Sequence, residues 1–307
     1  MKLAFVFPGQ GSQSVGMMQG WGEHPVVRAT FAEASDALGQ DLWTMVADGP
    51  ADLLNQTVNT QPAMLAADIA AWRVWQAAVG PAPALMAGHS LGEYAALVAA
   101  GALEFADAVR LVRFRAEAMQ AAVPEGVGAM AAILGLDDDA VRAVCGEAAA
   151  GDVVEAVNLN SPGQVVIAGE RAAVDRAMAL AKARGAKRAL PLPVSVPSHS
   201  SLMLPAAEKL LAHLQDVAIA MPVIPVLHNT DVQAHAEPET IRIALAKQLH
   251  TPVRWVETVQ AIKAAGVGRM VECGPGKVLA GLAKRIDDSL PVVALVDEAS
   301  LAAALSQ

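Results

Sequence analysis

One short segment of the sequence has the residue types and the spacing of a catalytic nucleophile. Gly88-His89-Ser90-Leu91-Gly92 fits the pattern G-x-S-x-G, in which a serine lies on a sharp turn between a strand and a helix. The apolar run 85–87 before it and the helix-like sequence after it supply that context. A serine at the start of a helix is well placed to develop negative charge. The alternative is a glycine-rich turn in which Ser90 only caps the helix.

A serine nucleophile needs a general base, and His199 is the best candidate among the seven histidines. It follows a β-like run in the segment 194–200, where Pro197 restrains the backbone. Its ring is therefore expected at the end of a strand, where a partner can reach it. The alternative is a histidine in a surface loop.

Arg115 lies on the wrong face of its predicted helix. At 100° per residue, the apolar side chains of residues 107–122 form one stripe, made of Ala108, Leu111, Val112, Ala118, Met119 and Ala122. Arg115 projects from near the middle of that stripe. A buried arginine is costly without an anionic partner. Either an internal carboxylate pairs with it, or it binds a carboxylate of the substrate in bidentate fashion.

The composition limits the classes of protein that can carry these residues. With 307 residues, 54% of them hydrophobic, the chain can bury a large core. A net charge of −9 argues against nucleic-acid binding, and no apolar run reaches the length of a membrane span. Pro8 and Gly9 end the first apolar run too early for a secretory signal. Two distant cysteines indicate neither a disulfide framework nor a metal site, so we expect a cytoplasmic protein without metal or cofactor.

The order of the predicted elements indicates an α/β fold in two parts. Strand-like runs at 3–7 and 84–87 alternate with helix-like segments at 62–78, 91–100 and 107–122, which predicts a mainly parallel sheet. From 126 to 195 the order becomes β-α-β-β-α-β, the ferredoxin-like pattern. We therefore predict a large, discontinuous α/β-hydrolase-like catalytic domain (1–125 and 196–307) and an inserted ferredoxin-like small domain (126–195).

Taken together, several motifs resemble malonyl-CoA:acyl-carrier-protein transacylases, the acyltransferases of fatty-acid synthesis, over almost the whole chain. Besides Arg115, the resemblance rests on motifs found in the expected order: Phe7-Pro8-Gly9-Gln10-Gly11-Ser12-Gln13, Gly88-His89-Ser90-Leu91-Gly92-Glu93-Tyr94, Asn158-Leu159-Asn160-Ser161-Pro162-Gly163-Gln164, Val196-Pro197-Ser198-His199 and Gly274-Pro275-Gly276-Lys277. Several motifs in one order are far more specific than any one of them.

The resemblance implies a role for each site residue. Ser90 would carry the malonyl group as an ester between coenzyme A and the phosphopantetheine thiol of acyl carrier protein, in a ping-pong mechanism. His199 would be the base, oriented by the main-chain carbonyl of Gln248. The backbone N–H groups of Gln10 and Leu91 would form the oxyanion hole. Arg115 would bind the malonyl carboxylate, in agreement with the helical pattern.

Two points complete what the resemblance implies. Asn160 lies in a motif that the family places near the active site. Val-Pro-Ser before His199 is the form associated with malonyl selection in the fatty-acid enzymes.

Three other interpretations remain open at this stage. A serine esterase with an α/β-hydrolase core would orient His199 with an acid and would not need Arg115. A polyketide acyltransferase or a carrier-binding scaffold would share the motifs. A nucleotide-binding loop at 7–11 is disfavoured because G-x-G-x-x-G is missing. The implied partners are malonyl-CoA and acyl carrier protein. Acyl carrier protein is acidic, so it would need local basic residues: Lys182, Arg184, Lys187 and Arg188, or Lys277, Lys284 and Arg285.

Overall fold

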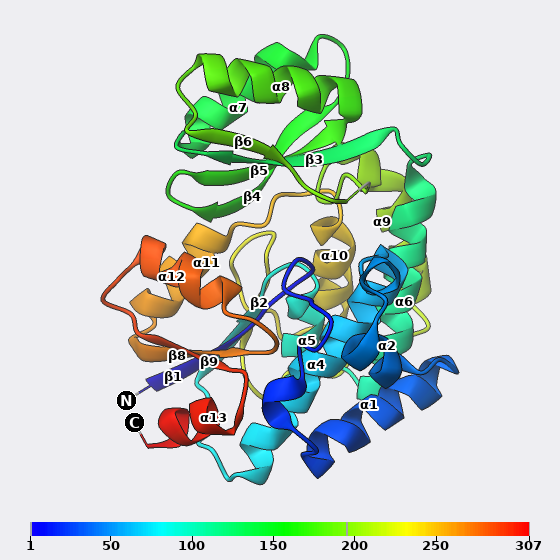
Figure 1. Ribbon diagram of the computed structural model, residues 1–307, viewed down its shortest axis with the longest axis vertical. Coiled ribbons are helices and arrows are strands. Elements are labelled where there is room, and N and C mark those ends of the chain that lie inside the picture. The colour runs from blue at the N-terminus through cyan, green and yellow to red at the C-terminus, as the bar shows by residue number, and fades with distance from the viewer. Residues whose placement is uncertain (1, 195, 307) are drawn as a thin grey trace.

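Two separate β-sheets organise the protein, as the ribbon in Figure 1 shows. The computed structural model describes residues 2–194 and 196–306. The first sheet has the order β7 (Val226–Leu227), β2 (Leu85–Gly88), β1 (Lys2–Phe7), β8 (Val267–Cys273) and β9 (Val292–Leu295), and all its pairings are parallel. Leu3 to Phe7 are all buried, as expected for a parallel strand covered on both faces.

Helices cover the parallel sheet and supply the elements that surround the site (Figure 1). Their bounds are α1 (Pro25–Leu38), α2 (Leu42–Asp48), α3 (Ala51–Leu54), α4 (Thr57–Ala77), α5 (Gly92–Ala99), α6 (Phe105–Ala122), α9 (Leu204–Leu214), α10 (Pro238–Gln248), α11 (Trp255–Ala264), α12 (Val278–Ile286) and α13 (Glu298–Leu305). Short 3-10 turns occupy Gln19–Trp21 and Ser201–Met203. None of the helices in the described residues is long and apolar enough to span a bilayer.

The second sheet is antiparallel and forms the upper part of Figure 1. Its order is β4 (Val154–Ser161), β5 (Gln164–Glu170), β3 (Gly128–Leu134) and β6 (Arg188–Pro191), with α7 (Asp138–Ala149) and α8 (Arg171–Ala183) packed on it. The chain order β3-α7-β4-β5-α8-β6 is the ferredoxin-like order, so the predicted fold class is confirmed. A main-chain bridge from Asn158 to Val253 ties this sheet to the rest of the chain.

The structure differs from the prediction at the start of one helix. The helix expected from Pro62 begins earlier, at Thr57, and Pro62 lies inside it. Thr60 holds that first turn, because its hydroxyl donates to the carbonyls of Leu54 and Gln56. The domain limits at 125/126 and 195/196 stay a prediction. Residues 1, 195 and 307, which begin or end the predicted domains, lie outside the described residues.

Candidate active site

Ser90 lies in a sharp turn between β2 and α5. Its φ is +52°, a conformation that costs energy for a residue with a side chain. A Cβ on Gly88 would overlap the backbone of Gly92, and a Cβ on Gly92 would overlap the carbonyl of Phe7. The two glycines therefore allow the strand and the helix to approach closely enough to expose the serine.

His199 contacts Ser90 and is oriented by a main-chain carbonyl. Ser90 Oγ lies 2.8 Å from His199 Nε2, and His199 Nδ1 lies 2.7 Å from the carbonyl oxygen of Gln248. A carbonyl only accepts, so Nδ1 carries the proton and Nε2 is left to accept the proton of the serine. Burial, and then the charge of Arg115, lower the pKa of His199 to about 3. The ring is therefore neutral at pH 7, as a general base must be.

Arg115 is buried beside the serine without a carboxylate partner among the described residues. Its Nη1 donates to Oε1 of Gln61 and its Nη2 to Oε1 of Gln248, each over 2.9 Å. Nη2 also lies 3.3 Å from Ser90 Oγ, and the side chain is only 1% exposed. The amides that orient the guanidinium are neutral, so no carboxylate contacts its charge directly, although the buried Glu93 carboxylate lies near enough to favour the charged form. Of the two interpretations of Arg115, the internal ion pair is therefore not found in the part of the chain that the structure describes.

The remaining predicted residues lie around this centre. Within the described residues, no protein group accepts from the backbone N–H of Gln10 or of Leu91, and both residues line the same pocket as Ser90. Asn160 Oδ1 lies 2.8 Å from Nε2 of His89, the neighbour of the nucleophile. Among residues 2–194 and 196–306, no three His, Cys, Asp or Glu side chains are grouped to hold a metal ion.

A cavity of about 190 Å³ opens onto the serine from the side of the antiparallel sheet. Ser90, His199 and Arg115 line its inner end. Apolar side chains form much of the wall: Met119 comes from α6, Met130 from β3, and Leu192, Val194 and Val196 from the segment that follows β6. The site therefore lies at the carboxyl end of β1 and β2, where ligands bind in open parallel sheets.

Sequence reasoning missed three buried polar residues that support the site. Gln61 contacts Arg115. Glu93 contacts Gln248, and Asn229 contacts Ser90. Glu93 had a weak signal, since it is a charged residue within the otherwise apolar start of α5. Asn229 had none, because β7 is only two residues long and gives no recognisable pattern.

Comparison with known proteins identifies the class of enzyme to which the chain belongs. Residues 4–303 match the family described as acyl transferase domain, so the chain is a member of the acyltransferases. Two relatives are named malonyl CoA-acyl carrier protein transacylase. That of Salmonella typhimurium is 58% identical, covering 100% of this chain and 99% of its own length. That of Bacillus subtilis is 45% identical, covering 99% of this chain and 96% of its own.

Solved structures agree with these relatives. The acyl-carrier-protein S-malonyltransferase of Burkholderia pseudomallei has a TM-score of 0.98 and 61% identity, and 100% of each chain is covered. A malonyl-transacylase solved in complex with a type II PKS acyl-carrier protein has a TM-score of 0.98 and 56% identity, covering 100% of this chain and 99% of the other. The chain therefore belongs to the malonyl CoA-acyl carrier protein transacylase family.

Proposed function

We propose that the protein transfers a malonyl group from malonyl-CoA to the phosphopantetheine thiol of acyl carrier protein, through an ester on Ser90. This ping-pong transfer would initiate and feed fatty-acid synthesis in the cytoplasm. The observation that carries the proposal is the buried guanidinium of Arg115, which no carboxylate contacts directly and which lies 3.3 Å from Ser90 Oγ. A site with that charge beside its nucleophile selects an acyl group that ends in a carboxylate.

In the first half-reaction, Ser90 attacks the thioester of malonyl-CoA. His199 Nε2 accepts the hydroxyl proton as Oγ bonds to the carbonyl carbon. The N–H groups of Gln10 and Leu91 donate to the oxyanion of the tetrahedral intermediate. The intermediate collapses, the carbon–sulfur bond breaks, and His199 returns the proton to the leaving thiolate. The products are free coenzyme A and the malonyl ester of Ser90.

The second half-reaction reverses these steps with a different thiol. His199 takes the proton of the phosphopantetheine thiol, the sulfur attacks the ester carbonyl, and the Ser90 alkoxide leaves and is protonated by His199. Arg115 holds the malonyl carboxylate throughout. The contact of His199 with the Gln248 carbonyl supports this scheme over a serine esterase, for which an acid at that position was expected.

Two basic side chains, one from each predicted domain, lie beside the β4–β5 turn. Arg285 of α12 donates to Gln164 at one side of that turn. On the other side, Gly163 lies against Gly135, which in turn lies against Lys187. Arg285 and Lys187 thus lie on the two sides of this turn, and we propose the face that they share with the neighbouring Arg188 as the docking surface for the acidic carrier protein.

The direct test is to supply malonyl-CoA and holo carrier protein together and to measure the masses of the carrier and of free malonate. The proposal predicts malonyl carrier as the main product, with little hydrolysis. Free malonate as the main product, or rapid hydrolysis of a neutral p-nitrophenyl ester, would favour an esterase instead.

A further inference from the structure

Glu93 is a fully buried carboxylate on which three donors converge. Its Oε2 accepts from the backbone N–H of Asn229 at 2.8 Å and from Nε2 of Gln248 at 2.9 Å. Its Oε1 accepts from Nδ1 of His228 at 2.8 Å. The reaction proposed above uses none of these contacts directly. A carboxylate can accept three hydrogen bonds at once, and no neutral side chain of this size accepts three as well.

One of these contacts leads to Arg115. Gln248 Nε2 donates to Glu93 and also to the carbonyl of Ser90, at 3.0 Å. With its nitrogen held there, the amide turns Oε1 toward Arg115 Nη2. The opposite orientation would bring an NH₂ group against the guanidinium and an oxygen against the carboxylate. Glu93 therefore selects the orientation of Gln248 that Arg115 requires.

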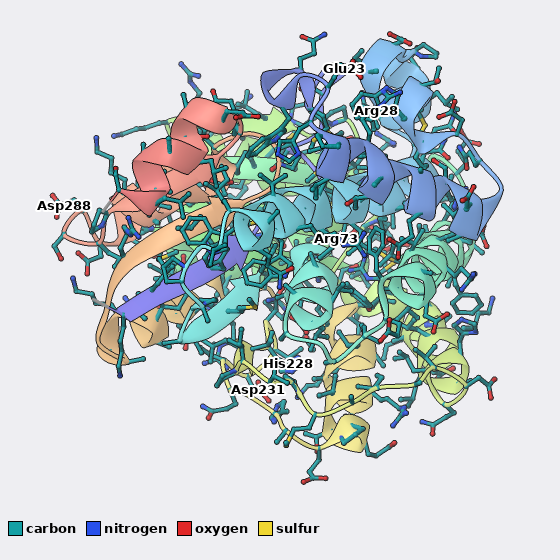
Figure 2. The ribbon with its side chains drawn as sticks, turned by 90° about the horizontal axis from the view of Figure 1, so that it is seen from below. Glu23, Arg28, Arg73, His228, Asp231 and Asp288 are labelled. Atoms are coloured by element: carbon teal, nitrogen blue, oxygen red, sulfur yellow. The ribbon has the colours of Figure 1, made fainter. Side chains whose placement is uncertain are left out.

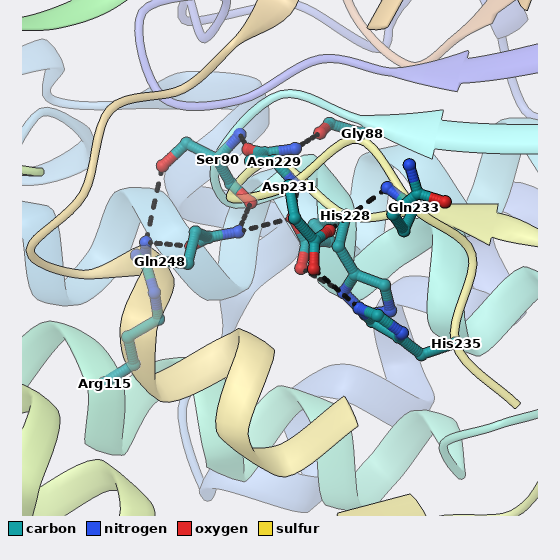
Figure 3. A network of polar contacts seen from close by, with 10 residues as sticks. Gly88, Ser90, Arg115, His228, Asn229, Asp231, Gln233, His235 and Gln248 are labelled. Carbon is teal, nitrogen blue, oxygen red and sulfur yellow. Dashed lines mark hydrogen bonds and ion pairs between the residues drawn. The ribbon is translucent and has the colours of Figure 1, made fainter. Parts of the chain in front are cut away.

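The second contact leads to the turn that carries the nucleophile. Asn229 Oδ1 accepts from the backbone N–H of Ser90, and Asn229 Nδ2 donates to the carbonyl of Gly88, each over 2.7 Å. In Figure 3 the dashed lines from Asn229 reach both Ser90 and Gly88. This side chain bridges the strained turn from both sides. Its main chain is fixed by Glu93, so the turn and the carboxylate are linked by a single residue.

The third contact anchors Glu93 on the side away from the pocket. The His228 ring packs on His235 with ring centres 5.0 Å apart, and His235 Nε2 lies 2.8 Å from Asp231. Figure 2 shows His228 and Asp231 next to each other in the loop that follows β7. The Nε2 atom of His228 has no hydrogen-bond partner among the described residues.

We propose that Glu93 is a positioning residue that fixes the placement of Arg115 relative to Ser90. It acts on Arg115 through Gln248 and on Ser90 through Asn229. The proposal rests on the function proposed above and adds a determinant of malonyl selection outside the pocket. Glu93 contributes by geometry, because it fixes which way two amide-bearing residues face. An error of about 1 Å in such a site costs on the order of a hundredfold in rate.

Two substitutions separate geometry from general stability. Glu93→Leu removes every acceptor. In Glu93→Gln, the carbonyl oxygen can face Asn229 and Gln248 while the amide donates to His228 Nδ1, since the proton of that ring can move to its unpartnered Nε2. The matched control is Glu272→Gln, another buried carboxylate, which accepts from the backbone N–H groups of Leu279 and Ala280.

The measurements are kcat/KM for malonyl-CoA and acetyl-CoA, together with the rate at which phenylmethylsulfonyl fluoride modifies Ser90. The sulfonyl fluoride has no carboxylate, so its rate reports on the reactivity of Ser90 and not on the binding of a substrate carboxylate by Arg115. For Glu93→Leu we expect the malonyl-over-acetyl preference to fall by about tenfold or more, and sulfonylation to slow as well. Glu93→Gln is expected to restore most of both, and Glu272→Gln to leave both unchanged.

Three outcomes would overturn the proposal. One is a Glu93→Leu protein of lowered melting temperature but unchanged preference, the signature of a purely structural residue. A second is an equal loss in Glu93→Gln and Glu93→Leu, which would assign the effect to charge. The third is a fall in the malonyl-over-acetyl preference that Glu93→Leu causes undiminished in an Arg115→Ala background, because the effect of Glu93 on preference acts through Arg115.

A separate pair of variants keeps the test decisive if Glu93→Leu does not fold. Gln248→Leu breaks the contact to Arg115, and Asn229→Ala breaks the contact to the turn. The first is expected to lower mainly the malonyl preference and the second mainly sulfonylation. The reverse pattern would overturn the proposal. If Arg115→Ala itself lowers malonyl and acetyl transfer equally, the proposed function fails, and that result is distinct from a failure of Glu93 alone.

Discussion

The guanidinium of Arg115 and the hydroxyl of Ser90 are in contact, with Nη2 3.3 Å from Oγ. Ser90 Oγ thus lies between a cation and the neutral base His199. A short acyl chain attached to Oγ can therefore bring its terminal carboxylate to the arginine without leaving the pocket. The amide partners of Arg115 are neutral, so a substrate carboxylate would be the first anion in direct contact with the guanidinium.

Replacing Arg115 by alanine should remove this contact selectively. We expect kcat/KM for malonyl-CoA to fall by about tenfold to a hundredfold, because a charged hydrogen bond to the substrate is lost, with a much smaller change for acetyl-CoA. Arg113→Ala is the matched control, since Arg113 lies on the same helix and contacts Gln40 instead. Equal losses for the two substrates would contradict the assigned role.

The pH dependence follows from the lowered pKa of His199. Burial and the Arg115 charge hold this pKa near 3, below the ordinary value of 6.5, so the base remains neutral at mildly acidic pH. The acidic limb of the kcat/KM profile should therefore lie below pH 6.5, and Arg115→Ala should move it upward. A limb at or above 6.5 in the unsubstituted protein would contradict the account.

The same shift has a consequence for stability with a defined sign. Between pH 6.5 and about 3 the unfolded chain binds a proton at His199 that the folded chain does not. This group's contribution to the free energy of unfolding is therefore present above pH 6.5 and lost as the pH falls through that window. Urea unfolding of the unsubstituted protein and of His199→Gln, compared at pH 7 and pH 5, measures it. The difference between the two proteins should move in favour of His199→Gln at pH 5.

Gly92 should tolerate no side chain. A Cβ there would overlap the carbonyl of Phe7, so Gly92→Ala must displace β1 or α5 and misplace Ser90. We expect a large loss of transfer activity and a lower melting temperature. Gly146→Ala on α7 is the control, because nothing lies within 4 Å of its Cβ. It should stabilise the protein by about 0.5–1 kcal/mol and leave activity unchanged.

The proposed docking face predicts that charge reversal there changes KM for the carrier protein much more than KM for malonyl-CoA. Charge reversal at Lys187 and Arg188, or at Arg285, should raise KM for the carrier protein several-fold, because an acidic partner then meets added negative charge. KM for malonyl-CoA should change much less. Lys209→Glu on α9 is the control for charge alone, since Lys209 is exposed outside this face. An unchanged KM for the carrier protein would show that the carrier docks on a different surface.

The fold class could be predicted because strong local patterns coincide with its main elements. The apolar run at β1, the glycines around Ser90 and the β-α-β-β-α-β order are all readable within short windows. β7, β8 and β9 were not predicted individually. β7 has only two residues, and its pairing with β2 joins segments far apart in the sequence.

Burial of Arg115 was predictable for a similar reason, since helix α6 spans 18 residues and its periodicity is clear. The partners of Arg115 were not predictable. Gln61 is 54 residues away in the sequence and Gln248 is 133 away, and neutral amides carry no pattern that marks them as ligands of a cation. The network around Glu93 depends equally on long-range contacts, and the structure was needed to find it.

The central claim is the malonyl ester of Ser90, and intact mass spectrometry tests it most directly. The protein and its Ser90→Ala variant are each mixed briefly with malonyl-CoA alone, then with holo carrier protein. The account predicts a single malonyl adduct on the unsubstituted protein, absent from Ser90→Ala and discharged by the carrier. An adduct that survives in Ser90→Ala, or malonyl carrier formed by that variant at an undiminished rate, would contradict it.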